Sequence, residues 1–160
     1  MSGITITVST VLSLLGLVIA FFYMKKVTSV PLDLGLNEED GKRLRFIHGA
    51  IAQGAMAFLK QEYKFLTIFM VSFAAIIVVL IDDAHTPDYR EGIYTAIAFL
   101  FGGFISILSG YIGMKVATQG NARTTVSAKR DISHAFDVAI NSGAVMGFAL
   151  VSLAVLGLVI

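Results

Sequence analysis

Four long apolar stretches alternate with shorter polar stretches along this chain. The apolar stretches cover residues 4–24, 65–81, 92–114 and 138–160, and the polar stretches between them carry every Lys, Arg, Asp and Glu. A helix crosses the hydrocarbon core of a membrane with about 20 apolar residues at 1.5 Å per residue. The pattern therefore predicts an all-α, polytopic membrane protein with four transmembrane helices.

We predict helices over residues 4–24, 42–81, 87–114 and 123–160, all in a single membrane region. The second has a mixed polar and apolar start, so its membrane part is placed at 58–81, and its start lies on the membrane surface or packs on other helices. Asn37, followed by three acids, is a helix cap, and Thr86 before Pro87 is another. The polar residues 119–121 predict a turn.

The composition supports a membrane protein and excludes other classes. Hydrophobic residues make up 56% of the chain and charged residues only 14%, too few to wet the surface of a soluble domain. The chain has no cysteine, so disulfides are excluded. We expect no nucleic-acid partner, although the net charge of +1 by itself does not decide this. Lys25 and Lys26 follow the first apolar stretch, whereas a cleaved signal peptide carries its positive charge before it.

The basic residues predict the orientation of the chain in the membrane. Eleven of the twelve Lys and Arg residues fall within 25–64 and 115–130, and only Arg90 lies in the 82–91 turn. Basic residues collect on the cytoplasmic side of membrane proteins. We therefore expect residues 25–64 and 115–137 to be cytoplasmic and the N-terminus to be outside. We expect the membrane itself to be the inner membrane of the cell.

Small residues recur on two of the predicted helices. Gly102, Ser106 and Gly110 are spaced by four, and Gly143 and Gly147 form a G-x-x-x-G pair. Such residues let membrane helices approach closely, so both faces are expected to contact other helices, including helices of a larger assembly. The last apolar stretch has no polar or basic flank, from which we expect the chain to continue beyond residue 160.

No catalytic constellation is evident, and we assign no catalytic, cofactor-binding or metal-binding residue. Asp131, His134 and Asp137 are spaced by three and share a helix face, where local ion pairs at a helix start are favoured over a metal site. His48 and His85 are isolated and are interpreted as loop or interface residues.

Two sets of charged residues keep alternative interpretations. Glu62 is the acid nearest the membrane interior, and an ion pair with Lys60 or Lys64 is favoured over a functional carboxylate. The second set is Arg123, Lys129 and Arg130. These cations could attract an anionic substrate or could simply fix the topology of the chain in the membrane.

Two runs of sequence resemble a known family. The run GYIGMKVATQGNARTTVSAKR, followed by AFDVAINSGAVMGF, and the run GAIAQGAMAFLKQEYK are similar to the N-terminal part of the membrane-integral, ion-translocating inorganic pyrophosphatases. The resemblance covers residues 42–160. It implies a much longer homodimeric chain with an inner and an outer ring of helices, in which these residues lie in the N-terminal part of the outer ring.

The resemblance also implies an activity that these residues do not carry alone. In that family, cytoplasmic hydrolysis of Mg²⁺-bound pyrophosphate drives H⁺ or Na⁺ outward, and K⁺ activates some subclasses. The family's catalytic acids lie on later helices, so the 160-residue segment is predicted to be inactive by itself. The alternative is a self-standing four-helix membrane scaffold or transporter subunit without catalytic activity.

Overall fold

The computed structural model describes residues 3–32, 35–81 and 90–159. Within them lie four helices, α1 (Gly3–Thr28), α2 (Glu38–Ile81), α3 (Glu91–Arg130) and α4 (Ile132–Val159). All four are long and apolar enough to cross a membrane, which confirms the predicted all-α, polytopic membrane fold.

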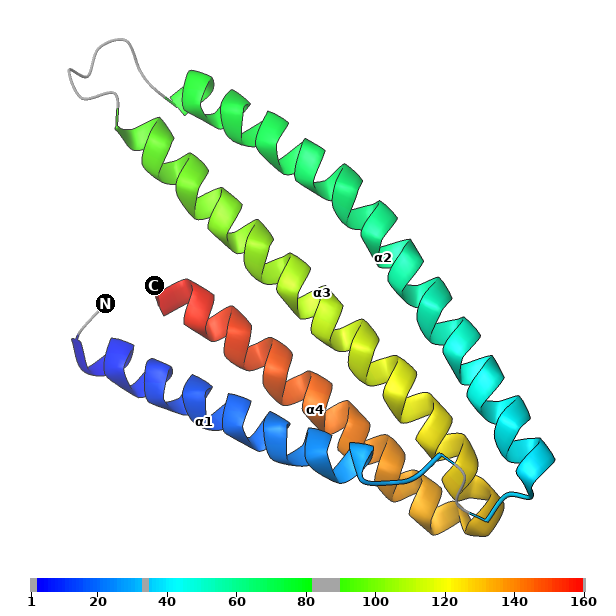
Figure 1. Cartoon of the computed structure of the whole chain (residues 1–160). Helices are drawn as coiled ribbons and strands as arrows, with labels where there is room; N and C mark the ends of the chain where they lie inside the picture. Colours follow the sequence, from blue (N-terminus) through cyan, green and yellow to red (C-terminus); the bar gives the residue numbers. More distant parts are fainter. Residues whose placement is uncertain (1–2, 33–34, 82–89, 160) are drawn as a thin grey trace.

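The helices are neighbours in the order α1, α4, α3, α2, and not in chain order. α4 packs against both α1 and α3, α1 also touches α3, and α2 contacts α3 only. Figure 1 shows α2 and α3 running side by side as the two longest helices, with the shorter α1 and α4 beside them. Large parts of each helix therefore meet no other helix among the described residues.

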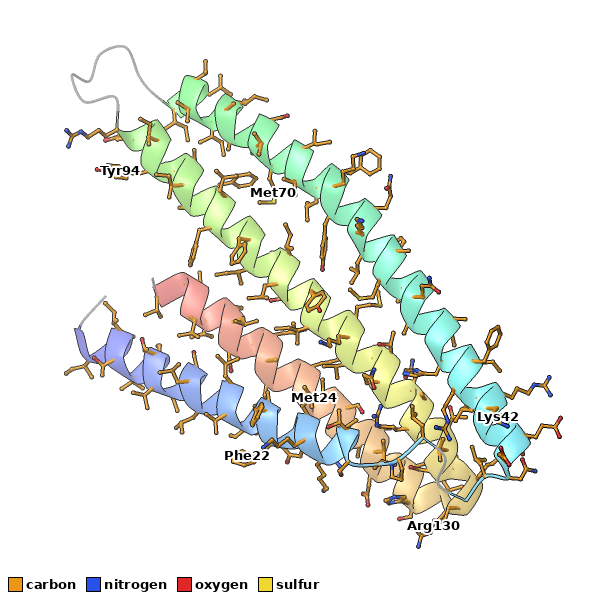
Figure 2. The ribbon with its side chains drawn as sticks, in the orientation of Figure 1. Phe22, Met24, Lys42, Met70, Tyr94 and Arg130 are labelled. Carbon is orange, nitrogen blue, oxygen red and sulfur yellow. The ribbon has the colours of Figure 1, made fainter. Side chains whose placement is uncertain are left out.

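Three helices share a small core. Ala20 of α1, Val116 of α3, and Val145 and Ala149 of α4 are all buried, and partly buried neighbours surround them, namely Tyr23, Met24, Ile112 and Met146. Small side chains at these positions let the helix backbones approach closely. On the other side of α3, Met70 lies between α2 and α3 (Figure 2).

Two helices are much longer than a membrane is thick. At 1.5 Å per residue, α2 with 44 residues and α3 with 40 extend about 60 Å or more, twice the hydrocarbon thickness of about 30 Å. Their charge-free parts are residues 65–81 and 92–114. Most of the rest of each helix exceeds the length that a membrane requires. Together with the start of α4 it forms a region that we call the charged end.

The second helix begins directly after the predicted cap, at Glu38, four residues before the predicted bound of residue 42. Asn37 Oδ1 accepts a hydrogen bond from the backbone N–H of Asp40 at 2.7 Å, and the N–H of Gly41 donates to the Asn37 carbonyl. Three acids, Glu38 to Asp40, then occupy the first turn, where the helix dipole favours negative charge. Residues 42–64 pack on α3, so of the two interpretations of this segment the structure supports packing on another helix.

The predicted turn at residues 119–121 is wrong. α3 continues as a helix through these residues to Arg130, and α4 starts at Ile132 instead of residue 123. Only Asp131 separates the two helices, in an extended conformation with φ −161° and ψ 135°. The predicted start of the third helix at residue 87, with its Thr86 cap, lies outside the described residues.

Candidate functional site

Arg123 ties the end of α1 to α3 at the charged end. Its Nε donates to the Val30 carbonyl at 3.0 Å and its guanidinium also reaches the Thr28 carbonyl at 3.5 Å. The same side chain donates to the carbonyl and the side-chain oxygen of Gln119, one turn earlier on α3. The carbonyls at the end of a helix lack partners within it, and Arg123 donates to the last carbonyl of α1, at Thr28, and to that of Val30 just beyond the helix.

The surroundings of Arg123 favour a structural role. Burial lowers the pKa of the Arg123 guanidinium below its ordinary value, but an arginine remains charged at any pH at which proteins fold. Its donors are directed at the carbonyls of its own chain. The interpretation of Arg123 as an attractor of anionic substrates is therefore not favoured by the structure.

A second link joins α2 to α3 a few residues away. Lys129 Nζ lies 3.1 Å from Asp40 Oδ2, near the start of α2, and both side chains are about half exposed. Exposed ion pairs contribute little stability, about 0–1 kcal/mol. Lys129 thus helps to position the start of α2 without holding it strongly. Arg130 is exposed in the last turn of α3, where a cation complements the helix dipole (Figure 2).

Asp131 forms the junction between α3 and α4. Its backbone N–H donates to the Ser127 carbonyl and ends α3, while its carboxylate accepts from the N–H of Ser133 at 3.2 Å. Its own carbonyl accepts the first helical hydrogen bond of α4, from Ala135. Asp131 is therefore the N-cap of α4. The sequence carries the signal for this junction, since a capping residue stands between a basic last turn and a new apolar run.

Glycines on α1 and α3 receive serines from α4. Gly16 faces the buried Ser152, and Gly120 faces the buried Ser142, at such short range that a Cβ on either glycine would overlap the serine side chain. Ser142 Oγ also donates to the Val138 carbonyl at 2.9 Å, so this buried hydroxyl has a hydrogen-bond partner within its own helix. These Gly–Ser pairs bring α4 close to α1 and α3, and the sequence interpretation missed them.

The predicted small-residue faces make few of the expected contacts. A Cβ added at Gly102, Gly143 or Gly147 would meet no neighbouring atom within 4 Å among the described residues. Gly110 does pack closely, because the Tyr63 hydroxyl lies 2.8 Å from the place of a Cβ and donates to the Ile107 carbonyl. The G-x-x-x-G pair belongs to the open face of α4, not to a contact within these four helices.

Glu62 does not form its predicted ion pair in the described part of the chain. Neither Lys60 nor Lys64 lies within ion-pair distance of the Glu62 carboxylate. Residues two apart on a helix point to different sides and cannot face each other. Glu62 is exposed and lines a groove of about 500 Å³ with Gln61, Phe58, Phe65, Leu66 and Phe69.

No metal site is evident in the part of the chain that the structure describes. No three His, Asp or Glu side chains come together there in a way that could hold an ion. Asp131 is engaged as a cap, which leaves His134 and Asp137 without a third ligand. His48 is half-buried on the side of α2 that faces α3, in line with an interface role, and His85 lies outside the described residues.

Comparison with known proteins gives a consistent family. Residues 14–160 match the model of the family "Inorganic H+ pyrophosphatase". The chain is 40% identical over 123 residues to a "K(+)-insensitive pyrophosphate-energized proton pump 2" of Moorella thermoacetica, covering 76% of this chain and 17% of that relative.

Two further relatives differ in the ion that they are named for. A "Putative K(+)-stimulated pyrophosphate-energized sodium pump" of Bacteroides thetaiotaomicron is 33% identical and covers 91% of this chain and 18% of the relative. A "K(+)-insensitive pyrophosphate-energized proton pump" of Methanosarcina mazei is 33% identical, and the match covers 90% of this chain and 19% of that relative. The chain thus spans less than a fifth of the length of each of these three relatives, and K⁺ dependence varies among them.

Proposed function

This chain belongs to the inorganic H⁺ pyrophosphatase family, and we propose that it serves as a scaffold segment of a pyrophosphate-driven ion pump. In the complete pump, cytoplasmic hydrolysis of Mg²⁺-bound pyrophosphate would drive H⁺ or Na⁺ outward. The four helices would form part of the outer ring of that pump, within a homodimer in the inner membrane. The family match over nearly the whole chain carries this proposal.

The chemistry of the described residues supports a scaffold role. Pyrophosphate is strongly anionic and is handled as a metal complex, which needs several carboxylates to hold the metal ions and cations to face the phosphoryl oxygens. The described residues include no carboxylate cluster that fits Mg²⁺. Arg123 and Lys129 are engaged with carbonyls and with Asp40, so neither is directed at a substrate. We therefore assign no step of hydrolysis to this chain.

The arrangement of the helices supports a place within a larger assembly. Within the described ranges, α2 contacts only α3, and α4 leaves its Gly143 and Gly147 face uncovered. Membrane helices associate through small residues that allow close approach. The remaining helices of the longer chain are the partners that we propose for these faces, with lipid on the others.

The activity of the full-length protein tests this function. In sealed membrane vesicles that contain it, pyrophosphate with Mg²⁺ should be hydrolysed and should drive uptake of either H⁺ or Na⁺, measured with a pH-sensitive dye and with radioactive sodium. Removing Mg²⁺ with a chelator should stop both. Folded full-length protein that leaves pyrophosphate intact would contradict the proposal.

The predicted orientation has its own test. Single cysteines replace Thr28, His85 or Asn121 in a full-length background without other cysteines, and intact cells are treated with a membrane-impermeant thiol reagent. Only the position 85 variant should react, because basic residues retain 25–64 and 115–137 in the cytoplasm. Labelling at position 28 or 121, with 85 silent, would invert the topology.

A further inference from the structure

One face of α2 carries a continuous row of exposed residues that no described helix covers. They are spaced by three or four and lie in the order Arg43, Ile47, Ile51, Gly54, Phe58, Glu62, Phe65 and Phe69, a row that we call the α2 strip. Residues at this spacing share one face of a helix. Ile47, Phe58 and Phe65 are 46%, 61% and 62% exposed.

The surface along the α2 strip is hollowed in two places. Near the charged end, Arg43 and Ile47 border a pocket of about 150 Å³ whose apolar wall includes Leu44 and Val126. A cavity of that size holds a benzene-sized group, so the pocket fits one large apolar side chain. Toward the membrane, Glu62 and three phenylalanines line the groove of about 500 Å³.

No single solvent suits the whole α2 strip. Ile47 and Ile51 precede the membrane part of α2, which is predicted to begin at residue 58, by 11 and 7 residues. At 1.5 Å per residue, this places them about 10–17 Å beyond it, where exposed apolar surface marks a protein contact. Phe69 continues the strip into the membrane, and Glu62 at its border is costly to expose to lipid.

A second copy of the chain is a poor occupant of this strip. Two copies share one orientation in the membrane, so a two-fold axis along the membrane normal would bring the strips together in parallel. Arg43 would then face Arg43 and Glu62 would face Glu62, and like charges in an interface cost several kcal/mol. An antiparallel pair would relieve this repulsion, but it would put the charged ends on opposite sides of the membrane.

We propose that the α2 strip is the docking face for one long helix of the complete polypeptide. That helix would insert an apolar side chain between α2 and α3 and would present an acid to Arg43 and a basic residue to Glu62. Arg43 and Glu62 are 19 residues apart, about 28 Å along the helix axis. The partner should therefore carry its acid and its base at about the same spacing, with the acid toward the charged end.

Photo-crosslinking of the full-length protein in its membrane tests this docking. The photoreactive residue p-benzoyl-phenylalanine replaces Ile47 or Phe65 in separate variants, and mass spectrometry identifies the crosslinked peptides. Both positions should react with one helix of the same polypeptide, at sites about 18 residues apart, as Ile47 and Phe65 are. Met56, which is exposed on the opposite side of α2, is the matched control and should not reach that helix.

Charge reversal supplies a second measurement. Arg43→Glu should lower the yield of the Ile47 crosslink several-fold, whereas Lys42→Glu should leave it unchanged, because Lys42 pairs with Glu38 at 2.7 Å on another face. Crosslinks from Ile47 and Phe65 to different segments, a product of dimer size, adducts with lipid alone, no product, or equal effects of the two reversals would overturn the docking.

The docking rests on the proposed function only in that the chain is part of a longer polypeptide. Crosslinking needs no catalytic turnover, so its failure and a failure of pyrophosphate hydrolysis are separate results.

Discussion

Gly120→Leu is expected to leave little folded protein. Gly120 lies where α3 meets α4, and a Cβ there would come within 2.8 Å of the Ser142 Cβ and still closer to its hydroxyl. Ser142 is buried and its hydroxyl donates to the Val138 carbonyl, so displacing this side chain would break that hydrogen bond. Overpacking of this kind costs typically about 1–3 kcal/mol, and a leucine adds further atoms at the same contact.

Alanine variants make the effect measurable where leucine prevents folding. Gly49 is exposed within α2 and has no neighbour near a Cβ, so it is the matched control. Gly49→Ala should raise the thermal midpoint of the full-length protein slightly, because alanine favours the helix by about 1 kcal/mol. Gly120→Ala should lower it, despite the same gain in propensity. A stabilising Gly120→Ala would mean that α3 and α4 are not in close contact there.

Arg123→Met is expected to lower stability by about 1.5–3 kcal/mol, the usual contribution of hydrogen bonds to a charged group. The substitution retains most of the apolar stem of the side chain but removes every donor. The carbonyls of Thr28 and Val30 then lose their partner, and the end of α1 is no longer tied to α3. Thermal unfolding of the purified full-length protein measures the loss.

Arg130→Met is the control for Arg123→Met. Arg130 is exposed in the last turn of α3 and acts mainly on the helix dipole, which is worth about 0.3–1 kcal/mol. Its loss should therefore be the smaller one. The difference should persist across the neutral pH range, because the Arg123 guanidinium stays charged despite its lowered pKa. Equal losses at the two positions would contradict the role given to Arg123.

The membrane fold could be predicted because its physical requirement is one of length and composition. A charge-free run such as residues 92–114 must be helical if it crosses hydrocarbon, since its backbone polar groups need partners there. The Asn37 cap could be predicted for a similar reason, because the cap and its three following acids act on the adjacent turn.

The α3–α4 junction was predicted at the wrong place because polar residues have more than one use. Gln119 and Gly120 are typical of a turn, but Gln119 accepts from Arg123 and Gly120 makes room for Ser142. Both uses depend on a partner that the local sequence does not reveal. The real junction at Asp131 carries a capping signal, but a turn at 119–121 competed with it.

The contacts of the small residues could not be assigned from spacing alone. Gly143 and Gly147 have the more familiar pattern, yet Gly16 and Gly120 make the close contacts, because α4 directs its serines to α1 and α3. The pairing of helices out of chain order decides which face is used. The predicted ion pair of Glu62 failed for a different reason, because Lys60 and Lys64 are each two residues away and lie on other sides of the same helix.

Pyrophosphate hydrolysis tests the central claim, that this chain scaffolds a pump whose chemistry lies elsewhere. Phosphate release with Mg²⁺ is measured for the 160-residue polypeptide alone, for the full-length protein, and for the full-length protein with Lys129→Ala. The polypeptide alone should release none, and the variant should keep its turnover, because Lys129 makes only an exposed ion pair with Asp40. Steady hydrolysis by the polypeptide alone, or complete loss of turnover in a normally folded Lys129→Ala protein, would contradict the account.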